Sequence, residues 1–333
     1  MILAGDIGAT KTDMALFSTE AGPRAPITQK EYPSSDYPSL AAIVREFLSE
    51  THQTVEGACF GVAGPVMDGV AKTTNLPWLI EESNLRDQFG LATVTLLNDL
   101  EATASAVPFL KPEDLHILNP GQPVRHGAIA VIAPGTGLGE AFLIWDGSQY
   151  RACPSEGGHA AFAPTDAGQI ELLESMREQF GHVSFERVCS ANGMPFIYEF
   201  LRGKDAAPEW DEVADEIAGA EDKARVIIDS ALAAERPSPL CAATLDMFVS
   251  ILAAEAGNLA LKVLATGGVY LGGGIPINIL PALEKGRFVD AFQRKGRFSE
   301  LLSRVPIHVM PSDAALIGVA VHGLGLAQPE RAS

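Results

Sequence analysis

Carboxylates stand beside glycine-rich turns in this chain, and that combination could bind phosphate. The first turn is GDIGATKTD at residues 5–13, where Asp6 closes an apolar strand, and the second is PGTGLG at residues 134–139. Glycines let a backbone approach a ligand closely, and consecutive N–H groups with threonine hydroxyls form a concave anion site. A carboxylate repels phosphate unless a metal ion such as Mg²⁺ lies between them. The two turns together favour a nucleotide clamped between two related halves, as in a kinase or an ATPase.

Each glycine run also has a plain structural explanation. Either turn alone is typical of a hairpin, since apolar strands are predicted on both sides of it. A third run, Gly272-Gly273-Gly274, follows a strand and would let a flat adenine ring lie against bare backbone, although glycine triplets also form ordinary turns. None of the runs is a Walker A loop, and a strand rather than a helix follows the first two, unlike a dinucleotide fingerprint. The common nucleotide folds are therefore disfavoured.

A second candidate group is Asn98-Asp99, at the end of a continuous apolar strand predicted at 94–97. In open α/β sheets, ligands bind at the carboxyl ends of strands. The same two residue types are also ordinary N-caps at a strand-to-helix junction. In a kinase, Asp99 would be the base that accepts the proton of the attacking hydroxyl, and Asn98 would orient the same substrate.

A third group could bind a polyol. The loop at 155–159 contains Glu156 and His159. A carboxylate can accept two hydroxyl protons, and a neutral imidazole can donate or accept one. The alternative is a solvated surface turn. Glu186 could be a third polar contact to a sugar or a surface charge paired with Arg187, and its position alone favours the surface charge.

The elements that must position these residues alternate between strands and helices in the first third of the chain. The pattern predicts strands within 2–18 and at 27–32, 57–63 and 94–97, and helices at 39–50, 81–89 and up to about 107. This order indicates a mixed or parallel sheet. Residues 65–78 and 151–169 are predicted to be polar loops.

The second part of the chain follows a predicted crossover at 108–123. It has a hairpin at 128–145, mostly helical sequence at 169–265, and strands at 269–271 and 306–309. An Ala-rich helix ends the pattern, with Ser312 and Asp313 as plausible caps. Such a helix could pack back on the first domain.

Composition limits the classes of partner. The 333 residues suffice for two domains, and 47% apolar with 20% charged residues is typical of a soluble globular protein. The net charge of -18 argues against nucleic acid and anionic membrane surfaces, which attract basic patches. No signal peptide or run of about 18 apolar residues is visible. The four scattered cysteines predict neither a zinc site nor a disulfide framework, and the cytoplasm is the expected compartment.

In this order, the motifs resemble those of bacterial glucokinases in the hexokinase/actin/Hsp70 superfamily, nearly from end to end. The matching runs are Gly5 to Thr10, Leu97-Asn98-Asp99, Gly135 to Gly139, Glu156 to His159, Glu186-Arg187-Val188 and Gly272 to Ile275. The resemblance implies an α/β, two-domain actin-like ATPase (ribonuclease H-like) fold with an interdomain cleft. The small domain would be 1–108 plus 313–333, and the large domain 109–312. A homodimer is also implied.

The resemblance further implies ATP and Mg²⁺ as cofactors, glucose as substrate and Asp99 as the catalytic base. Glucose would be bound by Asn75, Asn98, Asp99, Glu156, His159 and Glu186. The nucleotide would be bound by Gly5, Asp6, Ile7, Gly8, Ala9, Thr10, Lys11, Gly135, Thr136, Gly137, Gly272, Gly273 and Gly274. Asp6 would hold the metal through water.

Departures from the family pattern leave alternatives. Ala9 stands where a second glycine is usual and adds a methyl group near the expected phosphate. Ser190-Ala191-Asn192-Gly193 replaces the usual Ser-Gly-x-Gly, which bears on sugar preference. The alternatives are a kinase for another hexose, such as fructose, mannose or an N-acetylated sugar, and a non-catalytic sugar sensor. A DNA-binding sensor would need a helix-turn-helix, and none is visible.

Overall fold

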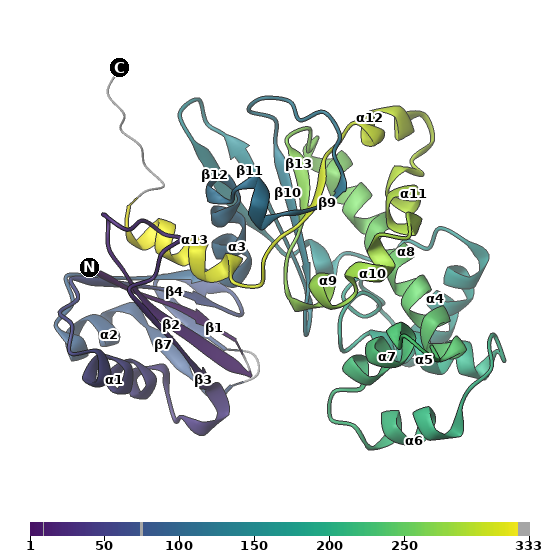
Figure 1. Cartoon of the computed structure of the whole chain (residues 1–333), viewed down its shortest axis with the longest axis horizontal. Coiled ribbons are helices and arrows are strands. Elements are labelled where there is room, and N and C mark those ends of the chain that lie inside the picture. Colours follow the sequence, from purple (N-terminus) through teal and green to yellow (C-terminus); the bar gives the residue numbers. More distant parts are fainter. Residues whose placement is uncertain (9, 74–75, 326–333) are drawn as a thin grey trace. The chain divides into compact units, whose positions relative to one another are not determined.

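The computed structural model describes residues 1–8, 10–73 and 76–325. Its chain divides into two compact units (Figure 1). Unit 1 consists of Met1–Pro112, Leu143–Pro154 and Asp313–Ser333, and unit 2 consists of Glu113–Phe142 and Ser155–Ser312. Two residues predicted in the site, Ala9 and Asn75, lie outside the described residues.

Unit 1 is built on a five-stranded sheet with the order β3-β2-β1-β4-β8. The strands are β1 (Ile2–Ile7), β2 (Lys11–Phe17), β3 (Thr28–Pro33), β4 (Gly57–Val62) and β8 (Thr93–Asn98). The hairpin partners β1, β2 and β3 are antiparallel, whereas β1, β4 and β8 run parallel. The predicted mixed sheet is confirmed. Its three parallel strands bring their carboxyl ends to one edge.

Four helices pack on this sheet: α1 (Leu40–Thr51), α2 (Glu82–Phe89), α3 (Asp99–Ala106) and α13 (Ala314–Gly323). The predicted C-terminal helix is therefore confirmed as α13, which packs against α3, β1 and β4 (Figure 1). This approach is close, because a side chain on Gly318 would overlap the carbonyl oxygen of Ala102. Asp313 occupies the N-cap position without a side-chain capping bond, so its predicted role as a cap is wrong.

The segment predicted as a polar loop after β4 instead forms a small antiparallel sheet. Its strands are β5 (Val66–Met67), β6 (Val70–Lys72) and β7 (Leu79–Glu81). The link from β6 to β7 is held at its ends. The Thr73 hydroxyl donates to the carbonyl of Leu76 at 2.8 Å, and the buried Trp78 donates its indole N–H to Tyr37 at 3.2 Å. Burial of Trp78 stabilises a segment that polarity alone assigns to solvent.

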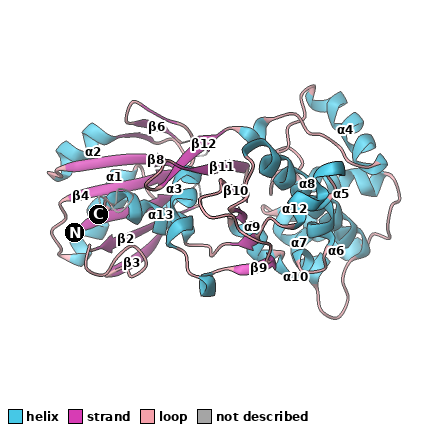
Figure 2. Cartoon of the chain, turned by 90° about the horizontal axis from the view of Figure 1, so that it is seen from above, coloured by secondary structure: helices cyan, strands magenta, loops and turns pink. Residues whose placement is uncertain are grey.

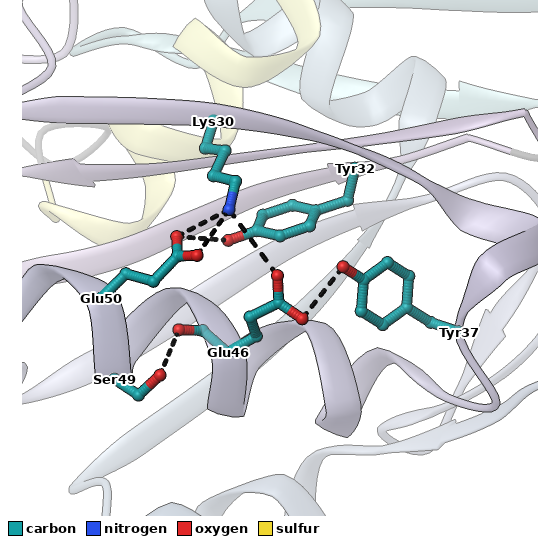
Figure 3. A network of polar contacts seen from close by, with 6 residues as sticks. All are labelled: Lys30, Tyr32, Tyr37, Glu46, Ser49 and Glu50. Atoms are coloured by element: carbon teal, nitrogen blue, oxygen red, sulfur yellow. Dashed lines mark hydrogen bonds and ion pairs between the residues drawn. The ribbon is translucent and has the colours of Figure 1, made fainter.

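A polar network joins strand β3 to helix α1 on the surface of unit 1 (Figure 3). The Lys30 ammonium donates to both carboxylate oxygens of Glu50 at 2.7 Å and lies 3.6 Å from Glu46. Tyr37 donates to Glu46 at 3.0 Å. Burial raises the pKa of Tyr32, next to Lys30, to about 12. Apart from the buried Tyr32, these side chains are partly exposed, and they attach the edge strand to a helix rather than form a site.

A six-stranded sheet, most of whose strands belong to unit 2, has the order β12-β11-β10-β13-β14-β9. The strands are β9 (His116–Asn119), β10 (Ile129–Pro134), β11 (Leu138–Trp145), β12 (Tyr150–Ser155), β13 (Gly268–Leu271) and β14 (Ile307–Val309). Strand β9 lies in the segment predicted as a crossover, where no strand was predicted. The start of the predicted polar loop at 151–169 is wrong, because β12 lies there. The predicted hairpin β10–β11 is confirmed. Strands β10, β13 and β14 run parallel.

The helices of unit 2 gather around one long helix, α8 (Pro239–Val263) (Figure 2). The others are α4 (Ala167–Phe180), α5 (Met194–Gly203), α6 (Asp211–Gly219), α7 (Lys223–Leu232), α9 (Gly274–Asn278), α10 (Leu280–Leu283), α11 (Arg287–Gln293) and α12 (Ser299–Ser303). Helix α8 is long and apolar enough to cross a membrane by length and composition. It packs against α5, α7, α11 and β10, and 72% of its most apolar window is buried. It is therefore the core helix of unit 2.

Candidate active site

The register of the parallel strands places the unit 1 candidates at one edge of the sheet. Ile7 of β1 pairs with Val62 of β4, which pairs with Asn98 of β8. Asp6 and Asp99 thus flank this common end, each within one residue of it. The Coulombic effect of Asp99 on the carboxyl of Asp6 shows that the two charges act on each other. The structure therefore brings together the predicted base and the predicted metal-binding carboxyl.

Asn98 serves as the N-cap of α3. Its side-chain oxygen accepts from the backbone N–H of Leu100 at 2.9 Å and of Glu101 at 3.3 Å. Its amide nitrogen donates to the carbonyl of Gly64 at 3.0 Å. The Asp99 carboxylate also accepts from the Leu100 N–H, at 3.0 Å. The capping interpretation of Asn98 is confirmed, and this capping holds Asp99 at the first residue of the helix.

Negative charge is concentrated around Asp6. Burial, together with the charges of Asp99 and Asp13, raises the pKa of the half-buried Asp6 carboxyl to about 7, and Lys11 lowers it in part. The Lys11 ammonium is itself held by carboxylates, at 2.8 Å from Glu31 and 3.2 Å from Asp13. A divalent cation would relieve the repulsion at Asp6. The donor set therefore fits a Mg²⁺ ion held by phosphates and water with one protein carboxylate nearby.

Ser34, a residue outside the sequence motifs, stabilises the first glycine turn. The buried Ser34 hydroxyl donates to the carbonyl of Gly8 at 2.8 Å and lies 2.9 Å from the Thr12 hydroxyl. The N–H of Gly8 donates to the carbonyl of Lys11 at 2.9 Å and so closes the turn. A phosphate would have to be bound by other groups of this turn. Only the pairing of β2 with β3 brings Ser34 here, so no local signal could have found it.

In unit 2, the three predicted sugar-binding residues lie together. His159 Nε2 is 3.8 Å from Glu156 Oε2, and its Nδ1 is 3.8 Å from Glu186 Oε1. Backbone pairing makes this possible, because the N–H of Glu186 donates to the carbonyl of Gly158 at 2.9 Å. Glu156 and His159 are exposed, and Glu186 is one-third exposed. The side chains form an accessible cluster of two carboxylates and an imidazole.

Glu186 also supports the second glycine turn. Its carboxylate accepts from the backbone N–H of Leu138 at 3.1 Å, and it lies so close to Gly137 that a Cβ there would overlap it. Arg187 instead lies over the ring of Phe180, 4.2 Å from its centre. The interpretation of Glu186 as a surface charge paired with Arg187 is therefore wrong. Gly137 therefore lies against a side chain predicted to bind sugar and is also part of the turn predicted for the nucleotide.

The third glycine run lies beside the second turn. Strands β10 and β13 pair in parallel, with Ile132 opposite Leu271, so both runs follow neighbouring strand ends. Gly273 has a φ of 78°, and a Cβ there would lie 2.8 Å from the carbonyl oxygen of Pro134. Gly272 donates its N–H to Ile132 at 2.9 Å. The predicted phosphate turn and the predicted adenosine segment are thus adjacent within unit 2.

The chemistry of the two groups limits the class of protein. One unit carries two interacting carboxyls at a strand edge, and the other carries an accessible cluster of two carboxylates and an imidazole beside glycine turns. No group of three metal-ligating side chains occurs among the residues that the structure describes. A metal ion would therefore depend on ligands that arrive with the substrate. These features define a sugar kinase.

Comparison with known proteins identifies the family. The model of the Glucokinase family matches residues 3–325, and this chain belongs to that family. The glucokinase of Nostoc punctiforme is 38% identical over 335 residues, which cover 96% of this chain and 98% of that protein. The glucokinase of Synechocystis is 37% identical and covers 96% of each chain.

Solved structures agree with this assignment. A glucokinase from an Antarctic psychrotroph matches with a TM-score of 0.79 at 30% identity, covering 97% of this chain and 98% of that one. A Balamuthia mandrillaris glucokinase in complex with glucose has a TM-score of 0.78 at 21% identity, covering 97% and 93%. A ROK family glucokinase from Streptomyces griseus, in complex with glucose and AMPPNP, has a TM-score of 0.65 at 17% identity, covering 97% and 98%. The last two show similarity of fold alone.

Proposed function

We propose that this member of the glucokinase family transfers the γ-phosphoryl group of ATP to the 6-hydroxyl of D-glucose. The observation that carries the proposal is the cluster of Glu156, His159 and Glu186, in which the imidazole lies 3.8 Å from each of the two carboxylates. Such a cluster matches several neighbouring hydroxyl groups, because carboxylates accept hydrogen bonds and imidazole can donate or accept one. The family assignment supports glucose as the acceptor.

Asp99 is the proposed base. It begins α3, where the capping bonds of Asn98 fix the backbone, and its carboxylate would accept the proton of the 6-hydroxyl. The 6-oxygen then forms a bond to the γ-phosphorus while the bond to the bridging oxygen breaks. The electron pair of that bond leaves with ADP. Asn98 would orient the same sugar through the hydrogen-bonding capacity of its amide that capping does not use.

The nucleotide would be bound by the glycine turns and the Gly272–Gly274 run. Asp6 would hold Mg²⁺ through water, since its carboxyl lies where negative charge is concentrated. When bound, Mg²⁺ neutralises phosphate charge. Ser34 would keep the first turn in shape through its bond to Gly8.

Several family properties remain part of the proposal. They are the actin-like arrangement of two domains with closure on substrate, the homodimer and the cytoplasmic location. The proposed base belongs to unit 1 and the polyol-binding cluster to unit 2. The reaction therefore requires both sets to reach one glucose molecule. Closure would exclude water from the transferring phosphoryl group.

The substrate is tested by a coupled ADP-release assay with glucose, mannose, fructose and N-acetylglucosamine. We expect glucose to have the highest kcat/KM by at least about tenfold, because hydroxyl-binding groups left unpaired disfavour analogues. A higher value for another hexose would assign the chain to that sugar. Loss of turnover with every sugar, while glucose still binds, would favour a sensor.

The base is tested by the Asp99→Asn variant. The amide keeps the bond from the Leu100 N–H but cannot take a proton, so kcat should fall by about 10²- to 10⁴-fold. Glucose binding, measured by titration calorimetry, should persist. Glu101→Gln on the same helix is the matched control and should keep kcat within about twofold. Near-normal turnover of Asp99→Asn would remove Asp99 from the mechanism.

A further inference from the structure

Glu140 is a buried carboxyl that the proposed reaction does not use. It follows the second glycine turn on β11 and is only 1% exposed. Its Oε2 atom lies directly behind Gly157, where a Cβ would overlap it, and its Oε1 atom has no hydrogen-bond partner within the described residues. Gly157 stands between Glu156 and His159. A buried acid thus lies against the backbone of the proposed sugar-binding loop.

The neighbour of Glu140 is a second buried carboxyl, Glu255 of α8. Glu255 is fully buried, and it accepts from the Asn258 amide at 2.8 Å and from the Lys262 ammonium at 3.1 Å. The charge of Glu255 helps to raise the pKa of Glu140, so the two carboxyl groups are close enough to affect each other. Two carboxyls can share a hydrogen bond only when one of them keeps a proton.

The donors around the pair decide which carboxyl keeps that proton. Glu255 has an amide and an ammonium that stabilise its charged form, whereas Glu140 has neither. Burial and the charge of Glu255 raise the pKa of Glu140 from 4.5 to about 7, and Lys262 lowers it in part. Glu140 is therefore the carboxyl of the pair that keeps its proton more readily.

Other charged and titratable groups face the pair from the elements packed around it. They are Lys262 on α8, Lys295 after α11 and Cys189 after the Glu186 segment. Lys295 donates to the carbonyl of Ala254 at 2.8 Å and to the Asn258 side chain, so it orients the amide that holds Glu255. Burial and both carboxyls keep the Cys189 thiol neutral by raising its pKa. Lys262 is thus the cation that directly offsets the single negative charge of the pair.

We propose that Glu140 is a positioning residue of the sugar site: as a neutral buried acid next to Glu255, it supports Gly157 and so holds Glu156 and His159 in place for glucose. This inference rests on the proposed role of those two residues in binding glucose. Loss of the Glu140 proton would place two adjacent negative charges behind the loop, in a space closed to water. The loop would have to move away, and glucose binding would weaken.

The sign of the pH effect follows from the raised pKa. Glu140 keeps its proton in the folded protein as pH approaches about 7, and it ionises as pH rises through that value. Glucose affinity should therefore be highest below about pH 7 and fall above it. The stability of the fold depends on pH with the same sign. The protonated Glu140 contributes fully to stability below pH 4.5, its ordinary pKa, and this contribution is lost as pH rises through about 7.

The first test compares the glucose KM of the full-length enzyme with that of Glu140→Gln between pH 6 and pH 9. The amide is neutral at every pH and has nearly the same size as the protonated acid. We expect similar KM values at pH 6.5 and a rise of about fivefold or more by pH 9 in the unsubstituted enzyme alone. Coincident KM curves, or a glucose KM more than about tenfold higher in Glu140→Gln at pH 6.5, would overturn the proposal.

The second test uses Glu140→Ala. Removing the side chain leaves a cavity behind Gly157, and the glucose KM should rise about tenfold while the ATP KM stays within about twofold. An unchanged glucose KM in a folded variant would contradict the proposal, and if this variant does not fold, the pH comparison decides. Should the unsubstituted enzyme fail to phosphorylate glucose at all, the proposed function fails first, which separates the two outcomes.

Discussion

Asp6 in unit 1 and Glu140 in unit 2 are two buried or half-buried carboxyls with the same altered acidity and different surroundings. The pKa of each is raised to about 7 by burial and by a second carboxyl, Asp99 for the first and Glu255 for the second. Each also lies in or next to a glycine turn. The two carboxyls differ in the groups that compensate the negative charge around them.

Compensation at Glu140 is internal, whereas at Asp6 it is left to a ligand. Glu255, the partner of Glu140, already has an amide and an ammonium as donors. Near Asp6, the ammonium of Lys11 is already bound by Glu31 and Asp13. A raised carboxyl pKa therefore accompanies two different roles. Asp6 belongs to a site that favours an incoming cation, whereas Glu140 is a protonated acid that supports the loop. The surrounding donors, rather than the shift, distinguish them.

Among the changes that test this contrast, the largest expected effect is on Asp6, the unit 1 carboxyl. Asp6→Asn removes the charge that would hold Mg²⁺ through water, so kcat should fall by about 10- to 100-fold and the Mg²⁺ concentration for half-maximal rate should rise. Steady-state rates over a Mg²⁺ titration measure both. If the variant keeps normal Mg²⁺ dependence, Asp6 is not part of the cation site, and the contrast with Glu140 disappears.

The second glycine turn allows a sharper comparison, because two of its glycines differ in their neighbours. A Cβ on Gly137 would overlap the Glu186 carboxylate, whereas a Cβ on Gly135 would meet nothing within 4 Å. Gly137→Ala should therefore raise the glucose KM about tenfold, and Gly135→Ala should change the ATP KM more than the glucose KM. Equal effects on the two substrates in both variants would show that the turn does not separate a sugar side from a nucleotide side.

The smallest effect concerns the two lysine–glutamate pairs. Lys262 and Lys30 are both half-exposed, but Glu255 is fully buried and Glu50 is exposed. Lys262→Met leaves a buried charge without its cation and should lower Tm by about 3–6 °C, whereas Lys30→Met should change Tm by less than about 2 °C. Thermal unfolding of both variants at one pH measures the difference. Equal decreases in Tm would mean that burial of the carboxylate does not determine how much the ion pair contributes to stability.

Elements with a clear local pattern could be predicted from the sequence. The alternating apolar runs of the hairpins and the buried strand before Asn98 were predicted at nearly their observed positions. The capping role of Asn98 follows from its residue type at a strand-to-helix junction. Predictions failed where a segment is polar but gains partners at a distance. Strands β6 and β12 are such cases, since pairing with neighbouring strands stabilises them more than their composition suggests.

By itself, the sequence determined which residue types stand at which strand ends, and with them the glycine turns, the candidate base and the family. The tertiary structure alone decided which of these groups meet. It turned Glu186 toward the second turn, placed Ser34 beneath the first and buried Glu140 behind Gly157. The physical reason is that strand pairing and burial join residues far apart in the chain. A residue's charge state and partners depend on that environment, which the neighbouring sequence does not contain.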